Sequence, residues 1–378
     1  MKKIFAWFVF ALAFFSSQAQ YTIRFVVKEI AVKAQDDIYI AGNFNNWNPS
    51  DPKSKLKPFG GGRRIIVLDN IDTGQYEFKF TRGNWAKVET TANGSDIANR
   101  FLDVKGDTTV EITIAGWKDD FPEKPKPSTA SSNVHVIDTA FFIPQLNRHR
   151  KIWIYLPASY NQTKNKFYPV LYMHDGQNLF NIQTAAFGEE WGVDECLDTL
   201  EAQTKKECIV VGIDNGNEKR TNEYNPYDNE KFGKGEGKEY IDFLVRTLKP
   251  QIDSSYRTLR DPDHTFIAGS SMGGLISLYA LVQYPNVFSG AGIFSPAFWV
   301  VPQMFTDVQN TKWKKDLRIY FYAGEKESSQ MVPDMQKMLD IIKEKKCCTT
   351  EFVTSPAGEH KEKYWRDEFD DFYRWIMR

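Results

Sequence analysis

A serine flanked by glycines carries the clearest chemical signature in this chain. The pentapeptide Gly269-Ser270-Ser271-Met272-Gly273 follows an apolar run at residues 265–268 and precedes a helix-like stretch at residues 275–281. A sharp turn from strand to helix strains the backbone of its central residue, and small residues two positions before and after it avoid a clash. The pattern predicts Ser271 as a nucleophile on such a turn. An ordinary glycine-rich turn is the other interpretation.

The positions of the histidines restrict the general base that would serve this nucleophile. In the α/β-hydrolase arrangement the catalytic groups follow the chain order serine, acid, histidine. Of the five histidines, only His360 follows Ser271, in a polar loop between a strand-like stretch at 350–354 and an amphipathic segment at 364–377. We therefore expect His360 to be the base, although a lone histidine in a polar loop is more often a solvated side chain.

The acid of such a site must lie between these two residues, at the end of a strand. The apolar and aromatic run at 317–323 reads as a buried strand and ends in Gly324-Glu325-Lys326-Glu327. Glu327, three residues past the glycine, has room to reach back to an imidazole, so we expect it to be the acid. Glu325 and Asp334 remain alternatives, and a solvated loop face is the bland interpretation of all three.

An oxyanion hole would complete the chemistry of acyl transfer. It uses the N–H after the nucleophile and a second N–H from the loop after an early strand. Residues 168–173 form that expected strand, and His174-Asp175-Gly176-Gln177-Asn178 follows it. The predicted backbone donors are Met272 and Gly176, with Gln177 as a close alternative for the second.

Composition limits what surrounds this site. The chain has 378 residues with a formal net charge of −1, and at about 150 residues per domain this length suggests two or three domains. Basic and acidic residues are interspersed, so no nucleic-acid partner is expected. No Cys-x-x-Cys or His-x-x-His spacing indicates a metal site, and the chemistry needs no cofactor. The aromatic content of 15% suits carbohydrate handling as well as core packing.

The N-terminus reads as a signal peptide at residues 1–19. Lys2 and Lys3 precede an apolar stretch at 4–15, and Ser17-Gln18-Ala19 fits a cleavage site. We expect an exported protein, periplasmic or extracellular, whose mature chain begins near Gln20 and has no membrane span. Export permits a disulfide between Cys196 and Cys208 without requiring one, whereas a bridge between the vicinal Cys347 and Cys348 would be strained.

The elements along the mature chain predict two domains. Five period-2 stretches separated by Gly, Pro, Asn and Asp predict a small immunoglobulin-like β-sandwich at 20–117; they are residues 21–27, 37–41, 64–68, 75–80 and 109–114. A Pro-, Ser- and Lys-rich linker follows at 118–133. From 134 to 378, strands alternate with helical segments, including 237–252, 275–284 and 332–345. This alternation predicts a mostly parallel sheet covered on both faces, as in an α/β-hydrolase.

The first domain resembles the starch- and glycogen-binding modules. The resemblance rests on the stretches 42–49 and 76–85 and on Asn99-Arg100. By position it implies a sugar site of Trp47, Lys79, Trp85 and Asn99, in which indole faces stack on pyranose rings while Lys and Asn hydrogen-bond the hydroxyl groups. The opposing interpretation is that both tryptophans pack in the sandwich core or against the larger domain.

The second domain resembles the esterase family related to esterase D, which includes feruloyl and acetyl esterases of plant cell-wall polysaccharides and siderophore trilactone esterases. The matching stretches are 173–180, 190–195, 269–274, 295–299 and 358–360 with Trp365. The resemblance implies the triad Ser271, Glu327 and His360, although many relatives carry Asp where Glu327 stands. Trp191, Tyr224 and Trp299 are candidates for an acyl or sugar pocket, but aromatic side chains are more often core.

These inferences favour a secreted serine esterase that acts through an acyl-enzyme and removes feruloyl or acetyl groups from polysaccharide. A siderophore trilactone or other small-molecule esterase is one alternative, and it would need no sugar-binding module. A glycan-binding protein with an inactive hydrolase domain is a second. A peptidase is a remoter option within the same fold.

Overall fold

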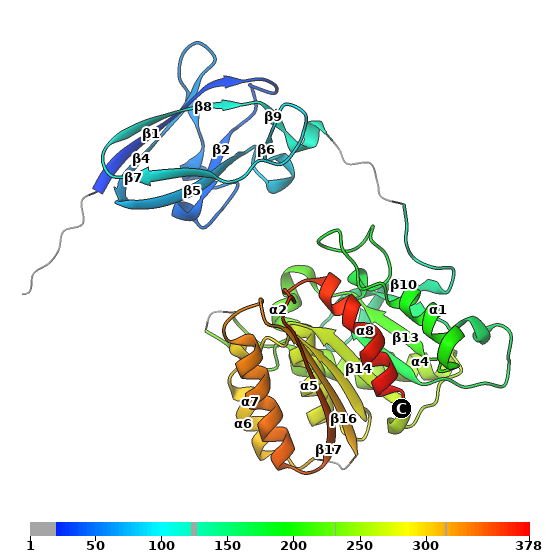
Figure 1. Cartoon of the computed structure of the whole chain (residues 1–378). Helices are drawn as coiled ribbons and strands as arrows, with labels where there is room; N and C mark the ends of the chain where they lie inside the picture. Colours follow the sequence, from blue (N-terminus) through cyan, green and yellow to red (C-terminus); the bar gives the residue numbers. More distant parts are fainter. Residues whose placement is uncertain (1–19, 122–126, 231, 314–315) are drawn as a thin grey trace, which may run out of the picture. The chain divides into compact units, whose positions relative to one another are not determined.

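A computed structural model describes residues 20–121, 127–230, 232–313 and 316–378. The predicted signal peptide at 1–19 lies outside these residues. The chain forms two compact units that divide between Lys124 and Pro125, within the predicted linker (Figure 1). Both described ends of that linker are bonded to their own unit. Asp119 forms an ion pair with Arg82 in the first unit, and the backbone N–H of Ser131 donates to Asp194 in the second.

Unit 1 is the predicted β-sandwich. One sheet has the order β3-β4-β1-β8, a second β2-β5-β7, and β6 pairs with β9. The strands are β1 (Gln20–Ile30), β2 (Tyr39–Gly42), β3 (Lys57–Pro58), β4 (Arg64–Asp72), β5 (Gly74–Thr81), β6 (Glu89–Thr90), β7 (Arg100–Val104), β8 (Thr108–Ile114) and β9 (Gly116–Trp117). Four short 3-10 helices connect them: η1 (Asn43–Asn45), η2 (Pro52–Ser54), η3 (Trp85–Lys87) and η4 (Lys118–Asp120).

The sandwich core follows from the alternation of apolar residues along these strands. In β1, Ile23, Phe25 and Val27 are buried because every second side chain of a strand points to the same face. Phe25 meets Phe78 of β5 edge to face, with ring centroids 4.8 Å apart. The two sheets therefore share one apolar interior, which closes the unit without a helix in its core.

Unit 2 is built on an eight-stranded sheet with the order β10-β11-β13-β12-β14-β15-β16-β17. Its strands are β10 (Val134–Ile143), β11 (Arg148–Tyr155), β12 (Val170–His174), β13 (Ile209–Ile213), β14 (Thr265–Ser270), β15 (Gly290–Phe294), β16 (Leu317–Gly324) and β17 (Cys348–Ser355). β11 is antiparallel to both of its neighbours, β10 and β13. The six strands β12 to β17 are parallel to one another. The mixed, mostly parallel sheet is that of an α/β-hydrolase, as predicted.

Helices cover both faces of this sheet (Figure 1). On one face α1 (Val193–Thr204) and α8 (Glu362–Ile376) share a core with the strands. The other face is covered by α3 (Gly237–Phe243), α4 (Lys249–Ser255), α5 (Met272–Gln283), α6 (Gln303–Asn310) and α7 (Met331–Glu344). A π-helical turn, η8 (Leu244–Leu248), joins α3 to α4, so the helix predicted at 237–252 forms in three consecutive segments.

Short segments at the carboxyl ends of the parallel strands carry the chemistry. After β12 comes η6 (Gly176–Asn178), and after β13 come η7 (Asn217–Lys219) and α2 (Arg220–Glu223). Parallel strands place their carboxyl ends at one edge of the sheet, where ligands bind in open α/β folds. At the same edge, η10 (Phe298–Val300) follows β15, whereas η5 (Ala158–Tyr160) follows the antiparallel β11 and η9 (Pro262–His264) precedes β14. Among the described residues, no helix has the length and apolarity to cross a bilayer.

Candidate active site

Ser271 lies between β14 and α5 in the strained conformation that the sequence predicts. Its φ of 59° and ψ of −121° are unusual for a residue with a side chain. The flanking glycines are needed for space. A Cβ on Gly269 would lie 2.9 Å from the carbonyl carbon of Gly273, and one on Gly273 would lie 3.3 Å from the Cβ of His174. The turn therefore requires small residues on both sides of the serine.

His360 is oriented by a buried carboxylate. Its Nδ1 lies 2.7 Å from Oε2 of Glu327, whose side chain is 1% exposed against 40% for the imidazole. The other carboxylate oxygen, Oε1, accepts hydrogen bonds from the hydroxyl of Ser295 at 2.6 Å and from the N–H of Gly324 at 2.7 Å. The same hydroxyl accepts from Nε1 of Trp365 at 2.8 Å. Glu327 is thus held at both oxygens.

The two other acids considered from the sequence do not contact the imidazole. Glu325 is exposed and accepts a hydrogen bond from the hydroxyl of Thr354 at 3.0 Å. Asp334 lies in the first turn of α7. Of the three candidate acids, only Glu327 contacts His360 among the described residues.

Ser271 and His360 line the same cavity, which has a volume of about 710 Å³. Among the described residues, no hydrogen bond joins the Ser271 hydroxyl to the imidazole. Catalytic hydrogen bonds are often long before a substrate is bound. Part of the wall is apolar, from Ala186, Phe187 and Trp365, and the rest carries polar side chains. The cavity therefore offers two chemically different surfaces near the Ser271 hydroxyl group.

The expected oxyanion donors occupy two different kinds of position. Met272 is the first residue of α5 and follows Ser271 directly, so its N–H belongs to the unpaired first turn of a helix. Gly176 is packed against the backbone of β13, where an added Cβ would lie 2.8 Å from the carbonyl carbon of Gly212. Gln177, the alternative second donor, lines the cavity, whereas Gly176 does not.

The three aromatic side chains suggested for the substrate pocket do not lie on the cavity wall. Trp191 is 2% exposed and stacks on Trp365, with ring centroids 5.6 Å apart. Tyr224 is fully buried, and its hydroxyl accepts a hydrogen bond from the N–H of Asp175 at 3.2 Å. Trp299 is 56% exposed and faces the ring of Phe232. Trp191 and Tyr224 support wall residues from behind, which fits the general preference of aromatics for the core.

Sequence reasoning missed the charged part of the wall. Arg220, from α2, donates to both oxygens of Asp175, at 2.7 Å from Nε and 2.8 Å from Nη2. Burial opposes ionisation of Asp175, but the Arg220 guanidinium and the Asn215 amide outweigh it and hold the pKa of the carboxyl below its usual value. Glu362 also lines the cavity, and burial raises its pKa. Asp175 follows β12 and Asn215 follows β13. Their positions at the ends of strands could have identified them as candidate site residues.

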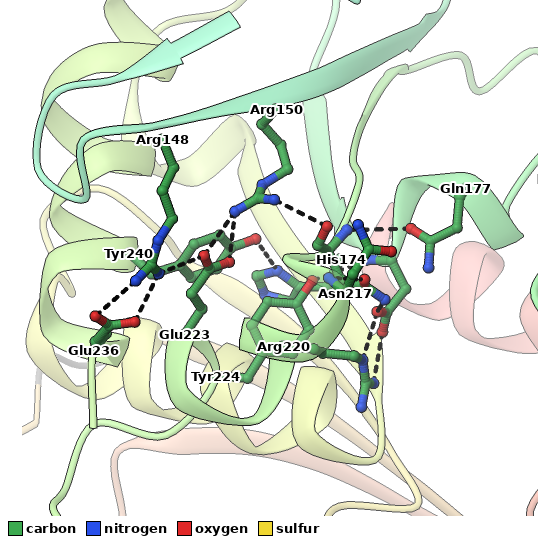
Figure 2. A network of polar contacts seen from close by, with 12 residues as sticks. Arg148, Arg150, His174, Gln177, Asn217, Arg220, Glu223, Tyr224, Glu236 and Tyr240 are labelled. Carbon is green, nitrogen blue, oxygen red and sulfur yellow. Dashed lines mark hydrogen bonds and ion pairs between the residues drawn. The ribbon is translucent and has the colours of Figure 1, made fainter. Parts of the chain in front are cut away.

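A network of charged and aromatic side chains surrounds Arg220 and His174 (Figure 2). Glu223 is fully buried and accepts hydrogen bonds from Arg148 and Arg150, both of β11, at 2.7 to 2.8 Å. Nδ1 of the buried His174 lies 2.9 Å from the hydroxyl of Tyr240. Burial lowers the pKa of His174 to about 3, so this imidazole is neutral at ordinary pH.

In unit 1, two of the residues suggested for sugar binding, Trp47 and Trp85, are in ring contact. The rings of Trp47 and Trp85 have centroids 6.2 Å apart, and Trp85 is 41% exposed. Neither belongs to the sandwich core. Lys79 is half-buried on β5, and the side-chain amide of Asn99 donates to Glu77 at 2.8 Å.

The cysteines and possible metal ligands add no further centre in the described residues. Cys196, Cys208, Cys347 and Cys348 are all free thiols. No group of three or more His, Cys, Asp or Glu side chains in the described parts of the chain is placed to hold a metal ion.

Comparison with known proteins gives relatives for most of the chain. Over 244 residues it is 26% identical to YbbA of Bacillus subtilis (strain 168), which carries the description uncharacterized protein, covering 60% of this chain and 92% of YbbA. It is 26% identical over 219 residues to an endo-1,4-β-xylanase/feruloyl esterase of Xylanibacter ruminicola, covering 56% and 27%. A match of 87 residues with an α-amylase of Niallia circulans reaches 40% identity and covers 23% and 7%.

Solved structures share the fold at low sequence identity. A ferulic acid esterase is 21% identical, with a TM-score of 0.50 over 65% of this chain and 98% of that one. The enterobactin esterase FES of Shigella flexneri is 16% identical, with a TM-score of 0.54 over 90% of this chain and 87% of that one. The family model described as "Putative esterase" matches residues 143–376, and the chain therefore belongs to this esterase family.

Proposed function

We propose that the protein is an exported serine esterase that removes feruloyl or acetyl groups from polysaccharide. Membership of the esterase family supports a carboxylic-ester hydrolase. The observation that carries the serine mechanism is the strained Ser271 on the wall of a cavity that also holds His360, with Glu327 hydrogen-bonded to the far nitrogen of that imidazole.

In the proposed mechanism the Ser271 hydroxyl attacks the ester carbonyl while Nε2 of His360 accepts its proton. Glu327 holds the imidazole in the tautomer with the proton on Nδ1 and stabilises the imidazolium. The N–H groups of Met272 and Gln177 or Gly176 bind the oxyanion, and we favour Gln177 because it lines the cavity. The imidazolium then protonates the departing alcohol, and the same base activates the water that hydrolyses the acyl-enzyme.

Replacing the nucleophile tests this proposal. Ser271→Ala and His360→Ala should each lower kcat/KM for 4-nitrophenyl acetate by a factor on the order of 10³ or more, with the circular dichroism spectrum unchanged. His264→Ala is the matched control, because the His264 side chain is 45% exposed and, among the described residues, its imidazole pairs only with Asp261. Full turnover in Ser271→Ala, or no release of 4-nitrophenol by the wild type above the uncatalysed rate, would overturn the proposal. The second result would instead favour an inactive hydrolase domain.

The acyl group and the alcohol are a finer part of the proposal. One relative is described as a xylanase/feruloyl esterase and one structural neighbour as a ferulic acid esterase. The apolar wall residues Ala186, Phe187 and Trp365 suit an aromatic acyl group. Turnover of methyl ferulate, acetylated xylan and a catecholate trilactone by the purified enzyme would rank these substrates.

A siderophore trilactone is the second candidate. The structural likeness to the enterobactin esterase extends over 90% of this chain, more than unit 2 alone supplies. Faster cleavage of the trilactone than of either plant cell-wall ester would favour this candidate over the first.

For unit 1 we propose a glycan-binding surface around Trp47 and Trp85. It is supported by the exposed ring of Trp85, by the place of both rings outside the sandwich core, and by the match of part of the chain with an α-amylase. Retention on insoluble starch or xylan that is lost in Trp47→Ala and in Trp85→Ala would support the proposal. Equal retention of both variants would contradict it.

Export is proposed from the sequence of residues 1–19. Expression of the full chain followed by mass spectrometry of the released protein should give a mature form that begins near Gln20. Retention of residues 1–19 in that form would contradict the proposal.

A further inference from the structure

The wall of the cavity contains an ion pair that the proposed proton transfers do not use. Arg220 and Asp175 both line the cavity, and their side chains are 27% and 7% exposed. A guanidinium has five N–H donors. In the described residues only Asp175 accepts from Arg220, through Nε and Nη2. The remaining donors have no acceptor among the described residues, although the group lines the same cavity as the proposed nucleophile.

The surroundings fix this pair in place. Asn215 donates to Oδ1 of Asp175 at 2.7 Å, and the Asn215 carbonyl accepts from Arg150 at 3.0 Å. The guanidinium also lies over the ring of Tyr224, 5.1 Å from its centroid. Rigid support of this kind is typical of side chains that must meet a ligand in a set geometry.

Buried anchors hold the segment that carries Arg220. Glu223, three residues further along α2, is fully buried and is held by Arg148 and Arg150 of β11 (Figure 2). Gly216 is packed so closely on Glu223 that an added Cβ would lie 2.6 Å from its carboxylate. The backbone that presents Arg220 is therefore anchored to the sheet from behind.

The charge balance indicates what the pair accepts. Asp175 already neutralises the guanidinium, and the Glu362 carboxyl group lines the same cavity, so an anionic substrate group gains little there. Asp175 receives three hydrogen bonds and has capacity for a fourth. The pair thus offers N–H donors and a carboxylate acceptor side by side. A hydroxyl group, which both donates and accepts, matches this combination.

We propose that Arg220 and Asp175 form a substrate-binding subsite for neighbouring hydroxyl groups of the ester. The inference rests on the proposed esterase function and adds the residues that select the substrate. Two sources present such hydroxyl groups, the diol of the esterified sugar and a catechol ring. Both would receive hydrogen bonds from the guanidinium and donate to Asp175.

The test measures selectivity within each variant, because a ratio of two substrates is insensitive to partial loss of folded enzyme. The sugar ratio compares kcat/KM for 5-O-feruloyl-arabinofuranose with that for methyl ferulate. The catechol ratio compares methyl caffeate with methyl cinnamate. Losing charge-assisted hydrogen bonds should lower the relevant ratio roughly 10- to 100-fold in Arg220→Gln. Arg220→Lys, which keeps the charge but loses the planar fork, should lower it less.

Lys219→Gln is the matched control, since Lys219 is the exposed neighbour of Arg220 and lies outside the cavity wall. A fall of the sugar ratio identifies a sugar diol, and a fall of the catechol ratio identifies a catechol. Active Arg220 variants with both ratios unchanged would overturn the subsite and leave the esterase proposal standing. A wild-type enzyme without Ser271-dependent turnover would overturn both.

Discussion

One carboxylate oxygen of Glu327 contacts His360, and the other accepts hydrogen bonds from neighbouring residues. Oε2 lies 2.7 Å from Nδ1 of the imidazole, and Oε1 accepts from Ser295 and Gly324. The acid side chain is buried and the imidazole is 40% exposed, so its far side is open to the cavity. The longer arm of a glutamate is accommodated because Glu327 lies three residues beyond Gly324, the last residue of β16.

Changing the acid to an amide should disable the base without disturbing its position. In Glu327→Gln the amide can donate to Nδ1, which favours the wrong imidazole tautomer, and kcat/KM should fall by a factor on the order of 10³ to 10⁴. Steady-state kinetics with 4-nitrophenyl acetate measures this loss. Glu325→Gln, at an exposed position bonded to Thr354, should stay close to the wild type. Equal losses in the two variants would contradict the role of Glu327.

Ser295 is predicted to act as a positioning residue for that acid. Ser295→Ala removes one donor to Glu327 and leaves Nε1 of the buried Trp365 without its acceptor. We expect kcat to fall roughly 10- to 100-fold with little change in KM, and unfolding free energy to fall by about 1–3 kcal/mol. Steady-state kinetics measures kcat and KM, and urea denaturation measures the unfolding free energy.

Ser289, just before β15, provides a matched control for Ser295, just after it. It is 4% exposed, and its hydroxyl has no hydrogen-bond partner in the parts of the chain that the structure describes. Ser289→Ala should therefore preserve both kcat and stability. If Ser295→Ala lost stability but kept the wild-type kcat, Ser295 would be a packing residue only.

The sequence predicted the local turn at Ser271, and the chain order limited the candidate base to one histidine. The chain order singled out His360, and the glycine spacing predicted the turn at Ser271 that the structure contains. The α/β-hydrolase sheet and the sandwich were predictable from periodicity. Strand β7 (Arg100–Val104) was missed, because its apolar and polar residues do not alternate: Phe101 and Leu102 are adjacent, and Phe101 is 56% exposed.

Residues that meet only through the tertiary fold were out of reach. Ser295 and Glu327 are 32 positions apart, and Asp175 and Arg220 are 45 apart, so no local spacing links them. The aromatic residues show the opposite error, because the sequence suggested pocket residues that do not line the cavity. Trp191 and Tyr224 have the chemistry of a pocket but are buried behind it, and burial depends on packing that composition does not encode.

The C-terminal part of the linker, residues 127–133, is hydrogen-bonded to a loop that leads to the cavity wall. The hydroxyl of Ser128 accepts from Asn181 at 3.0 Å, and that of Thr129 accepts from the N–H of Ile182 at 2.9 Å. The same loop continues to Ala186 and Phe187 on the cavity wall. A combined Ser128→Ala and Thr129→Val variant should loosen the loop, raising KM for methyl ferulate roughly 3- to 10-fold with kcat little changed.

Hydrogen exchange provides a second test of whether these linker hydrogen bonds stabilise the loop. Amides at 181–187 should exchange faster in the double variant, because local opening becomes easier when anchoring hydrogen bonds are lost. Ser132→Ala is the control, since Ser132 is exposed and has no hydrogen bond in the described residues. Unchanged exchange and unchanged KM in the double variant would show that the linker does not support the cavity.

His174 is predicted to make the fold sensitive to acid. It packs against Tyr224 and Tyr240, with Asp175 and Arg220 as the nearest charges. Burial is the main cause of the lowered pKa of about 3, compared with 6.5 for an unperturbed histidine. Because the folded-state pKa lies below the unfolded one, the stabilisation is present above pH 6.5. It is lost as the pH falls from there towards 3, at up to about 1.4 kcal/mol per pH unit.

Urea denaturation between pH 4 and pH 7 can isolate this contribution by its slope. His174→Phe removes the titrating group and should flatten the dependence of unfolding free energy on pH, whatever its effect at pH 7. Tyr240→Phe removes the hydrogen bond to the imidazole while keeping the histidine, so its slope should match that of the wild type. Because both substitutions disturb the same aromatic cluster, a difference in slope between them must come from proton binding. Equal slopes would assign the acid sensitivity to carboxyl groups elsewhere in the fold.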